Sequence, residues 1–218
     1  MLKKMNYVLF IILLCLLSGC FGPAPEEKIY TILEEAVTLE DSFKEQQQPL
    51  LELEKKEADL YNKIMDLGMK EFEQVVSLSK QALTSVEERE SKIQMEYDSI
   101  MSSKDKFNEI NEEIEKIKDE TLLQSAQELK STMESRYKSY EKLYENYKKS
   151  ISLDKELYSM LQKEDLEMEQ LETQIDKINK SYQSVMEQNN EFNKLTEQYN
   201  DLKIKFYEEA NLNVEKSE

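Results

Sequence analysis

Apolar residues recur at seven-residue intervals along two long segments of this chain. The segment 69–118 carries one such series, and the segment that begins at Asp165 carries another. A seven-residue interval keeps side chains on one face of a helix, as in helices that pack side by side at about 20°. The pattern therefore predicts two long helices whose inner faces carry Val86, Ile93, Ile100, Phe107 and Ile114 in the first, and Leu171, Ile178, Val185, Phe192, Tyr199 and Phe206 in the second.

Two further segments carry apolar stripes with helical spacing. The first, Glu26–Leu67, contains Pro49, which should kink the helix because proline removes a backbone hydrogen bond. The second follows Thr121. The stripes comprise Ile29, Leu33, Ala36, Phe43, Leu50, Leu60, Ile64 and Leu67 in the first segment, and Leu122, Ala126, Leu129, Met133, Tyr137, Tyr140, Tyr144, Tyr147 and Ile151 in the second.

Three local signals mark the boundaries between these segments. Gly68 is a candidate for the residue that follows the end of the first helix, because glycine readily ends helices in a left-handed conformation. The sequence Thr121–Gln124 is typical of a capping box that opens a helix. Asp165 is the candidate N-cap of the last segment.

Every glycine and proline lies in the first third of the chain, and none occurs from Met69 to Glu218. Such a stretch excludes sandwiches, barrels and βα repeats, so the fold class is all-α. Four segments of similar length joined by short turns pack best as a long antiparallel up-and-down helical bundle. We expect this bundle to span residues 26–212, with a frayed C-terminus at 213–218. If the helix continues through Gly68, the bundle has three helices instead; four are favoured.

The N-terminus has the organisation of a lipoprotein signal peptide. Cationic residues precede an apolar stretch, Tyr7–Leu17, that is too short to span a bilayer. The ending Leu17, Ser18, Gly19 and Cys20 resembles the lipobox of bacterial lipoproteins. That resemblance implies cleavage after residue 19, lipidation of Cys20 and a short tether over residues 20–25. The alternative is an ordinary secretory signal that happens to contain Cys20.

Composition excludes several classes of function. The net charge of −17 argues against nucleic acid and against anionic lipid surfaces as partners of the helices. The chain has no histidine, and loss of Cys15 with the signal peptide leaves only Cys20. We therefore expect no disulfide, no enzymatic activity, no metal site and no cofactor.

One segment, 121–162, departs from the acidic character of the others. Tyrosines alternate there with cations, an arrangement able to stack on sugar rings and hold acidic groups of a wall polymer. The alternative is that the tyrosines, at helical spacing, fill the bundle core. The candidate binding face comprises Arg136, Tyr137, Lys138, Tyr140, Lys142, Tyr144, Tyr147, Lys148 and Lys149.

Several sequence patterns outside the lipobox identify the chain as similar to a known family. They are Ala24–Tyr30, Gln46–Leu50, Leu67–Lys70, Arg136–Lys138 and Lys163–Leu166. Together with Cys20, these patterns resemble the YkyA-type cell-wall-binding lipoproteins of Gram-positive bacteria. The resemblance covers essentially the whole mature chain and implies a four-helix up-and-down bundle, with no catalytic or ligand residues to carry over.

These observations lead to two hypotheses for function. In the first, the protein is held by its lipid on the extracytoplasmic face of the cell membrane and binds peptidoglycan or another wall polymer, or acts as a structural spacer. In the second, it is an adaptor that docks another envelope protein through a helix face. An apolar stripe left exposed after bundle packing would favour the second hypothesis.

Overall fold

The computed structural model describes residues 22–212. The predicted signal peptide, the lipobox Leu17–Gly19, the proposed lipidation site Cys20 and the residues 213–218 lie outside this range. Among the helices of the described part, none combines the length and the apolar character needed to cross a membrane.

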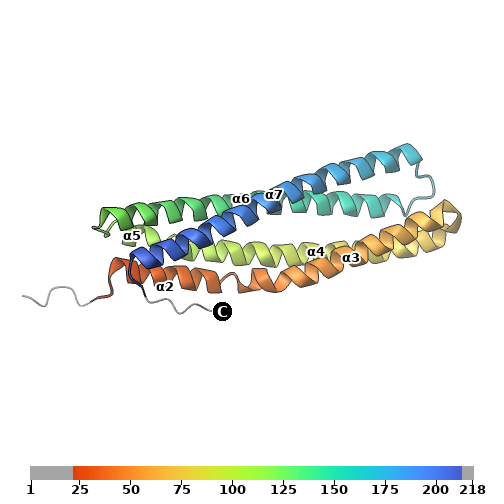
Figure 1. Ribbon diagram of the computed structural model, residues 1–218. Helices are drawn as coiled ribbons and strands as arrows, with labels where there is room; N and C mark the ends of the chain where they lie inside the picture. The colour runs from red at the N-terminus through yellow and green to blue at the C-terminus, as the bar shows by residue number, and fades with distance from the viewer. Residues whose placement is uncertain (1–21, 213–218) are drawn as a thin grey trace, which may run out of the picture.

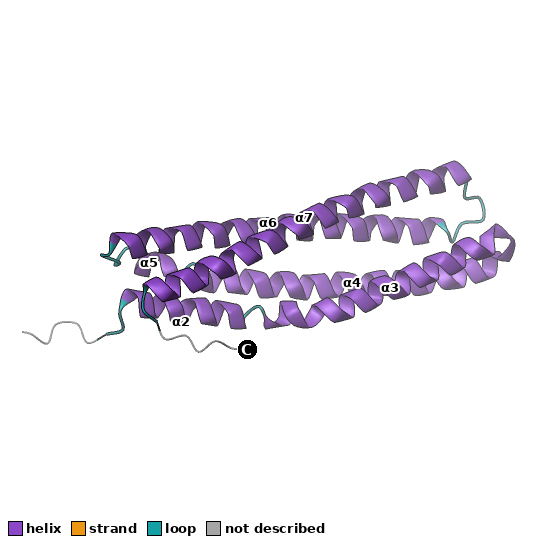
Figure 2. Ribbon diagram, viewed as in Figure 1, coloured by secondary structure: helices purple, strands orange, loops and turns teal. Residues whose placement is uncertain are grey.

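The chain folds into four antiparallel helical passes (Figures 1 and 2). The expected all-α bundle and its four helices are therefore confirmed, and residues 22–212 contain no strand. The first pass is divided into two helices, and the second ends in a short one. The elements are α2 (Pro25–Thr38) and α3 (Asp41–Leu67), a 3-10 turn η1 (Gly68–Glu71), α4 (Phe72–Phe107) and α5 (Ile110–Ile114), α6 (Glu120–Met160), and α7 (Met168–Glu209).

Gly68 separates the first pass from the second. Its φ of 59° and ψ of −176° lie in a region that residues with a Cβ rarely adopt, and its N–H donates to the carbonyl of Ile64. Gly68 therefore ends α3, and the chain reverses through η1.

The helix starts differ from the two predicted caps. Asp119, rather than Thr121, caps α6: its side chain accepts a hydrogen bond of 2.8 Å from the N–H of Leu122. The N-cap of α7 is Glu167 rather than Asp165, and its side chain makes no capping bond. Both predictions missed by two residues, since several polar residues precede each helix and local sequence does not rank them.

The predicted apolar series form the core. Val86, Ile93, Ile100, Phe107 and Ile114 are all buried, which confirms the seven-residue seam of the second pass. The seam of α7 is buried at every expected position except Ile178, which is half-buried. The core has one cluster around α2, α5 and the start of α6, and a second around α3, the first half of α4 and the end of α6.

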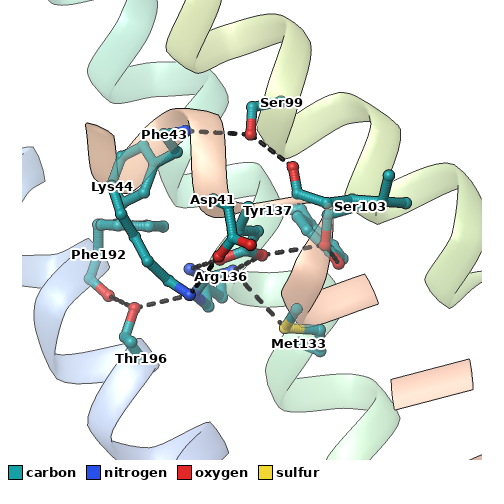
Figure 3. A network of polar contacts seen from close by, with 12 residues as sticks. Asp41, Phe43, Lys44, Ser99, Ser103, Met133, Arg136, Tyr137, Phe192 and Thr196 are labelled. Atoms are coloured by element: carbon teal, nitrogen blue, oxygen red, sulfur yellow. Dashed lines mark hydrogen bonds and ion pairs between the residues drawn. The ribbon is translucent and has the colours of Figure 1, made fainter. Parts of the chain in front are cut away.

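The first pass is interrupted at Leu39–Glu40 and not at Pro49, which lies inside α3. Ser99 of α4 inserts its hydroxyl at the interruption (Figure 3). It donates to the carbonyl of Leu39 at 2.6 Å and accepts from the N–H of Phe43 at 3.1 Å. These two backbone groups would bond to each other in a continuous helix, so the serine replaces that bond and separates α2 from α3.

The bundle is closed at the end that carries the N-terminus and open at the other end. At the closed end, the rings of Tyr30 in α2 and Tyr207 in α7 lie 4.9 Å apart, and Glu34 accepts hydrogen bonds from Tyr207 and Lys203. Farther along, α3 and α7 diverge, while α3 stays on α4 and α7 stays on α6 (Figure 1). This divergence leaves the seam between α3 and α7 open.

Candidate binding groove

A groove of about 970 Å³ runs along the open seam between α3 and α7. Its floor comes from α4 and α6, so all four passes contribute. Six tyrosines line it, together with four carboxyl groups, a buried arginine and several amides. Its lining includes Lys44, Gln47, Leu51, Glu54 and Glu57 of α3, Arg89 and Glu96 of α4, Tyr140, Tyr144, Tyr147, Asp154 and Tyr158 of α6, and Asn179, Tyr182, Met186, Asn189 and Asn193 of α7.

The groove lies in the half of the bundle that is remote from the N-terminus. Its residues on α6 run from Tyr140 to Tyr158, whereas the helix starts at Glu120 near the N-terminal end. At 1.5 Å per residue, the groove therefore begins about 30 Å and ends about 57 Å along α6 from that end. A chain tethered at its N-terminus would present this groove away from the tether.

Arg89 occupies the floor of the groove and is almost fully buried. Its guanidinium contacts Glu57 of α3 and Asp154 of α6, the latter at 3.3 Å. It also donates to the hydroxyls of Tyr147 at 3.3 Å and Tyr182 at 2.6 Å. Arg89 of α4 therefore contacts side chains of α3, α6 and α7 at the bottom of the groove.

Two carboxyl groups share this single guanidinium. Burial raises the pKa of Glu57 to about 7, even though Arg89 opposes the rise. Burial likewise raises the pKa of Asp154, which accepts a hydrogen bond of 2.6 Å from Tyr182. Because one cation cannot balance two buried anions, we expect one proton to be shared between these carboxyls near neutral pH.

Glu96 is a second buried carboxyl, nearer the closed end of the groove. Its side chain accepts a hydrogen bond of 2.6 Å from Gln47 and a longer one of 3.4 Å from Tyr140. Burial raises the pKa of Glu96 to about 8, and the negative charge of Glu54 adds to the rise. Among the described side chains, no cation pairs with Glu96 or Glu54.

The two walls of the groove differ in character. The wall from α3 carries Glu54 and Glu57, whereas every groove residue of α7 is uncharged at neutral pH. The α7 wall offers three exposed amides, Asn179, Asn189 and Asn193. At the rims, Leu51 of α3 is 59% exposed and Met186 of α7 is 67% exposed. The groove therefore combines acidic, amide, aromatic and aliphatic groups, a lining suited to binding an amphipathic ligand.

The nine residues of the predicted binding face do not share one surface. Arg136, Tyr137 and Tyr140 are buried, and Tyr144 and Tyr147 are half-buried. Of these five, Tyr140, Tyr144 and Tyr147 line the groove. The remaining four, Lys138, Lys142, Lys148 and Lys149, are exposed.

Helical geometry explains this division of α6. At 100° per residue, Lys138, Lys142 and Lys149 fall within about 40° of one another, roughly opposite Tyr140 and Tyr147. The tyrosines face the bundle, and these three lysines face solvent on its far side. Tyr137 therefore fills the core, as the alternative interpretation of the tyrosine stripe expects, whereas Tyr147 borders the groove. Binding of a polymer by the stripe stays a prediction.

The charged residues Arg89 and Glu96 at the bottom of the groove were not predicted from the sequence, although the heptad pattern of α4 contains a signal for them. The seam of α4 places Val86, Ile93 and Ile100 at one inner position of each heptad. The second inner position, three residues later, is held by Arg89, Glu96 and Ser103. Charged residues at inner heptad positions indicate a buried polar site, and these three side chains are indeed buried.

Most of the polar groups in the groove bond to one another. The phenols of Tyr147 and Tyr182 donate to Glu54 and Asp154, so carboxyls and hydroxyls satisfy one another. Within residues 22–212, no cluster of three acidic, histidine or cysteine side chains has the geometry of a metal site. The groove offers a ligand the carboxyl groups of Glu54 and Glu96, next to aromatic rings.

Comparison with known proteins places the chain in a family. The model of the YkyA family, described as "Putative cell-wall binding lipoprotein", matches residues 24–209. A curated relative from Bacillus subtilis (strain 168), named "Uncharacterized lipoprotein YkyA", is 38% identical over 202 residues, which are 93% of this chain and 91% of that protein.

A solved structure has the same fold. It is a conserved protein of unknown function from Staphylococcus aureus that aligns with a TM-score of 0.59 at 17% sequence identity, covering 86% of this chain and 98% of the other. At that identity the likeness concerns the fold alone. The match over residues 24–209 and the identity to the Bacillus relative show that this chain belongs to the YkyA family of cell-envelope lipoproteins.

Proposed function

We propose that this protein is a non-catalytic, membrane-anchored rod that binds a polymer of the cell wall through the groove between α3 and α7. In this proposal, Cys20 carries the lipid on the extracytoplasmic face, and the bundle extends from the membrane toward the wall. The observation that carries the proposal is the position of the groove, which opens in the half of the bundle remote from the N-terminal tether.

The length of the rod suits this role. The 41 residues of α6 extend for about 60 Å. The predicted tether of residues 20–25 adds at most about 20 Å when fully extended. The groove would thus stand clear of the lipid headgroups, while the closed end of the bundle would lie near the membrane.

The lining of the groove fits the chemistry of wall polymers. The half-buried rings of Tyr144 and Tyr147 offer apolar contact area for sugar rings and aliphatic side chains. The amides of Asn179, Asn189 and Asn193 can donate to and accept from peptide groups or N-acetyl groups. A second surface also calls for a test, because Lys138, Lys142 and Lys149 form an exposed cationic stripe on the opposite side of α6.

The test is sedimentation of the chain from Phe21 onward with purified wall sacculi, with and without teichoic acids, across salt and calcium concentrations. This chain retains both hydrophobic clusters and all four helical passes. Saturable binding supports the proposal. Absence of binding under every condition rejects wall binding.

A pair of variants locates the binding surface. Leu51→Lys with Met186→Lys places two cations at exposed positions on the groove rims. The matched control is Met168→Lys with Ile204→Lys, which adds the same charges at exposed positions outside the groove. The proposal predicts that only the first pair weakens sedimentation. Equal effects of the two pairs would reject the groove as the binding surface.

The second candidate function is docking of another envelope protein. The exposure of Leu51 and Met186 on facing rims favours it, because a partner helix could cover both. A photo-crosslinking side chain at position 186 in intact cells separates the two functions. Crosslinks to sacculi support wall binding, whereas one discrete protein adduct without sacculus binding supports docking.

A further inference from the structure

We propose that the groove recognises a primary ammonium group at Glu96, in a groove that Glu54 also lines, and that its ligand is the peptide stem of peptidoglycan. This inference rests on the proposed wall-binding function and specifies the ligand of the same groove. It follows from three features of the lining: the balance of charge, the placement of Glu96, and the amide wall of α7.

Carboxyl groups outnumber cationic side chains in the lining of the groove. Four carboxyl groups border it, and its two cations are Arg89 and Lys44. Arg89 is shared by Glu57 and Asp154. Lys44 pairs with Asp41 at 3.0 Å, outside the groove lining (Figure 3). Glu54 and Glu96 therefore have no cationic partner among the described side chains, and the groove is complementary to a positively charged ligand.

Glu96 is the group that most needs such a ligand. It is only 6% exposed, and its hydrogen bonds come from the neutral donors Gln47 and Tyr140. A buried carboxylate without a cation is costly, so burial favours the protonated form of Glu96 near neutral pH. An ammonium ion within hydrogen-bond reach would stabilise the ionised form instead. Glu54 also lines the groove, about two helical turns from Glu96, because it accepts from Tyr147 whereas Glu96 accepts from Tyr140.

Aromatic rings complete the site. Tyr140 and Tyr147 donate hydroxyl groups to Glu96 and Glu54, respectively, so these rings lie beside the two carboxyls. Tyr144 lies between them on the same face of α6 and stacks on Tyr97, with ring centroids 4.2 Å apart. An alkylammonium chain would lie along these rings while its charged end reaches the carboxyl group of Glu96.

The α7 wall distinguishes a peptide from a simple amine. Asn179, Asn189 and Asn193 are exposed along this uncharged wall, and their amides match the donors and acceptors of peptide bonds. Wall stem peptides carry both features, peptide bonds and an amino group on a long side chain. The D-alanyl esters of teichoic acids share the ammonium group but lack a peptide of this length, so we assign the stem peptide.

The test uses calorimetric titration with a synthetic stem tetrapeptide whose third residue is lysine. The matched ligand carries an acetyl group on the same side-chain nitrogen, and D-alanylated teichoic acid serves as the other source of amines. Acetylation should weaken binding about tenfold or more, because hydrogen bonds between charged groups are among the strongest in proteins.

Two variants of the chain from Phe21 onward complete the test. Glu96→Gln removes the charge but keeps the shape of the protonated acid, so the fold should be retained. It should weaken the free peptide about tenfold and leave the acetylated peptide unchanged. Glu145→Gln, at an exposed position of α6 outside the groove, should change neither affinity.

Equal binding of the free and acetylated peptides, or an unchanged affinity of E96Q, overturns the inference. Binding of D-alanylated teichoic acid without binding of the peptide overturns the assigned source. These outcomes are separable from failure of the proposed function. If sacculi sediment the protein regardless of Glu96, wall binding holds and the ammonium site fails. If the peptide binds through Glu96 but sacculi do not sediment the protein, the ammonium site holds and wall binding fails.

Discussion

Arg136 of α6 and Glu40, at the junction of α2 and α3, form two parallel hydrogen bonds of 2.7 Å each across the bundle. Both side chains are buried, and Ser103 also donates to Glu40 at 3.0 Å. The Arg136 guanidinium lies 4.6 Å from the ring centroid of Phe192 and donates to Thr196 in α7 (Figure 3). This pair links the interrupted first pass to the third and fourth passes.

Removing the cation from this pair should be strongly destabilising. Arg136→Met leaves the Glu40 carboxylate buried without a cation, and we expect the free energy of unfolding to fall by about 3–5 kcal/mol. Urea denaturation followed by circular dichroism measures the change.

A second variant separates the buried charge from lost packing. Adding Glu40→Gln to Arg136→Met removes the unpaired charge and should recover part of the loss. As a control, Lys104→Met breaks a pair with Glu141 that is about one-third exposed on each side, and should cost less than about 1 kcal/mol. A loss below about 1 kcal/mol for Arg136→Met would contradict the role assigned to the pair.

The buried carboxyls make stability depend on pH in an unusual direction. Burial raises the pKa of Glu96 from its ordinary value of 4.5 to about 8, so between these values the folded state holds a proton that the unfolded state has lost. The stability contributed by this group is therefore complete below pH 4.5 and is lost as the pH rises toward 8. Glu57, whose pKa burial raises to about 7, acts in the same direction over a lower range.

We therefore expect the protein to be less stable at pH 9 than at pH 6. One unit of pKa shift corresponds to about 1.4 kcal/mol, and the loss should be of the order of 2 kcal/mol. Glu96→Gln cannot titrate and should remove most of the fall above pH 7. Urea denaturation at pH 6, 7, 8 and 9 gives the comparison, and parallel curves for the two proteins would exclude Glu96 as the source.

The turn at Gly68 offers a matched test of backbone strain. Gly68→Ala should destabilise the protein by about 1–3 kcal/mol, because alanine is strained at a φ of 59° and a ψ of −176°. An added Cβ would meet no atom within 4 Å at Gly68 or at Gly22, so steric contact does not enter. Gly22→Ala should leave the thermal midpoint unchanged. Equal midpoints for the two variants would contradict the strain argument.

Two substitutions at the start of α6 test whether Asp119 or Thr121 caps the helix. Asp119→Ala removes the hydrogen bond to the N–H of Leu122 and should cost about 0.5–2 kcal/mol. Thr121→Ala alters the predicted cap and should change the stability by less than about 0.5 kcal/mol. Chemical denaturation of both variants decides between them, and a larger cost for Thr121→Ala would favour the cap predicted from sequence.

The pattern of apolar residues was enough to favour four helices over three and to predict most of the core. Burial follows helical spacing directly, so the positions of Ile93, Ile100 and Phe107 in the core follow from their seven-residue interval alone. The reversal at Gly68 was also predictable, because it depends on the local backbone preference of glycine.

The interruption of the first pass and the groove were not predictable in this way. The interruption depends on Ser99 and Arg136, which are far from Glu40 in sequence. The groove depends on the divergence of α3 from α7, which local periodicity does not report. Ile178 fits its heptad as well as Val185 does, yet it borders the groove and is only half-buried.

The most direct test of wall binding through the groove compares two surfaces in a single sacculus-binding assay. One protein carries Leu51→Lys and Met186→Lys at the groove rims, and the other carries Lys138→Gln, Lys142→Gln and Lys149→Gln on the opposite side of α6. Our account predicts that the groove variant loses about tenfold or more in affinity while the lysine variant binds like the wild type. Full binding by the groove variant, with loss in the lysine variant, would contradict it.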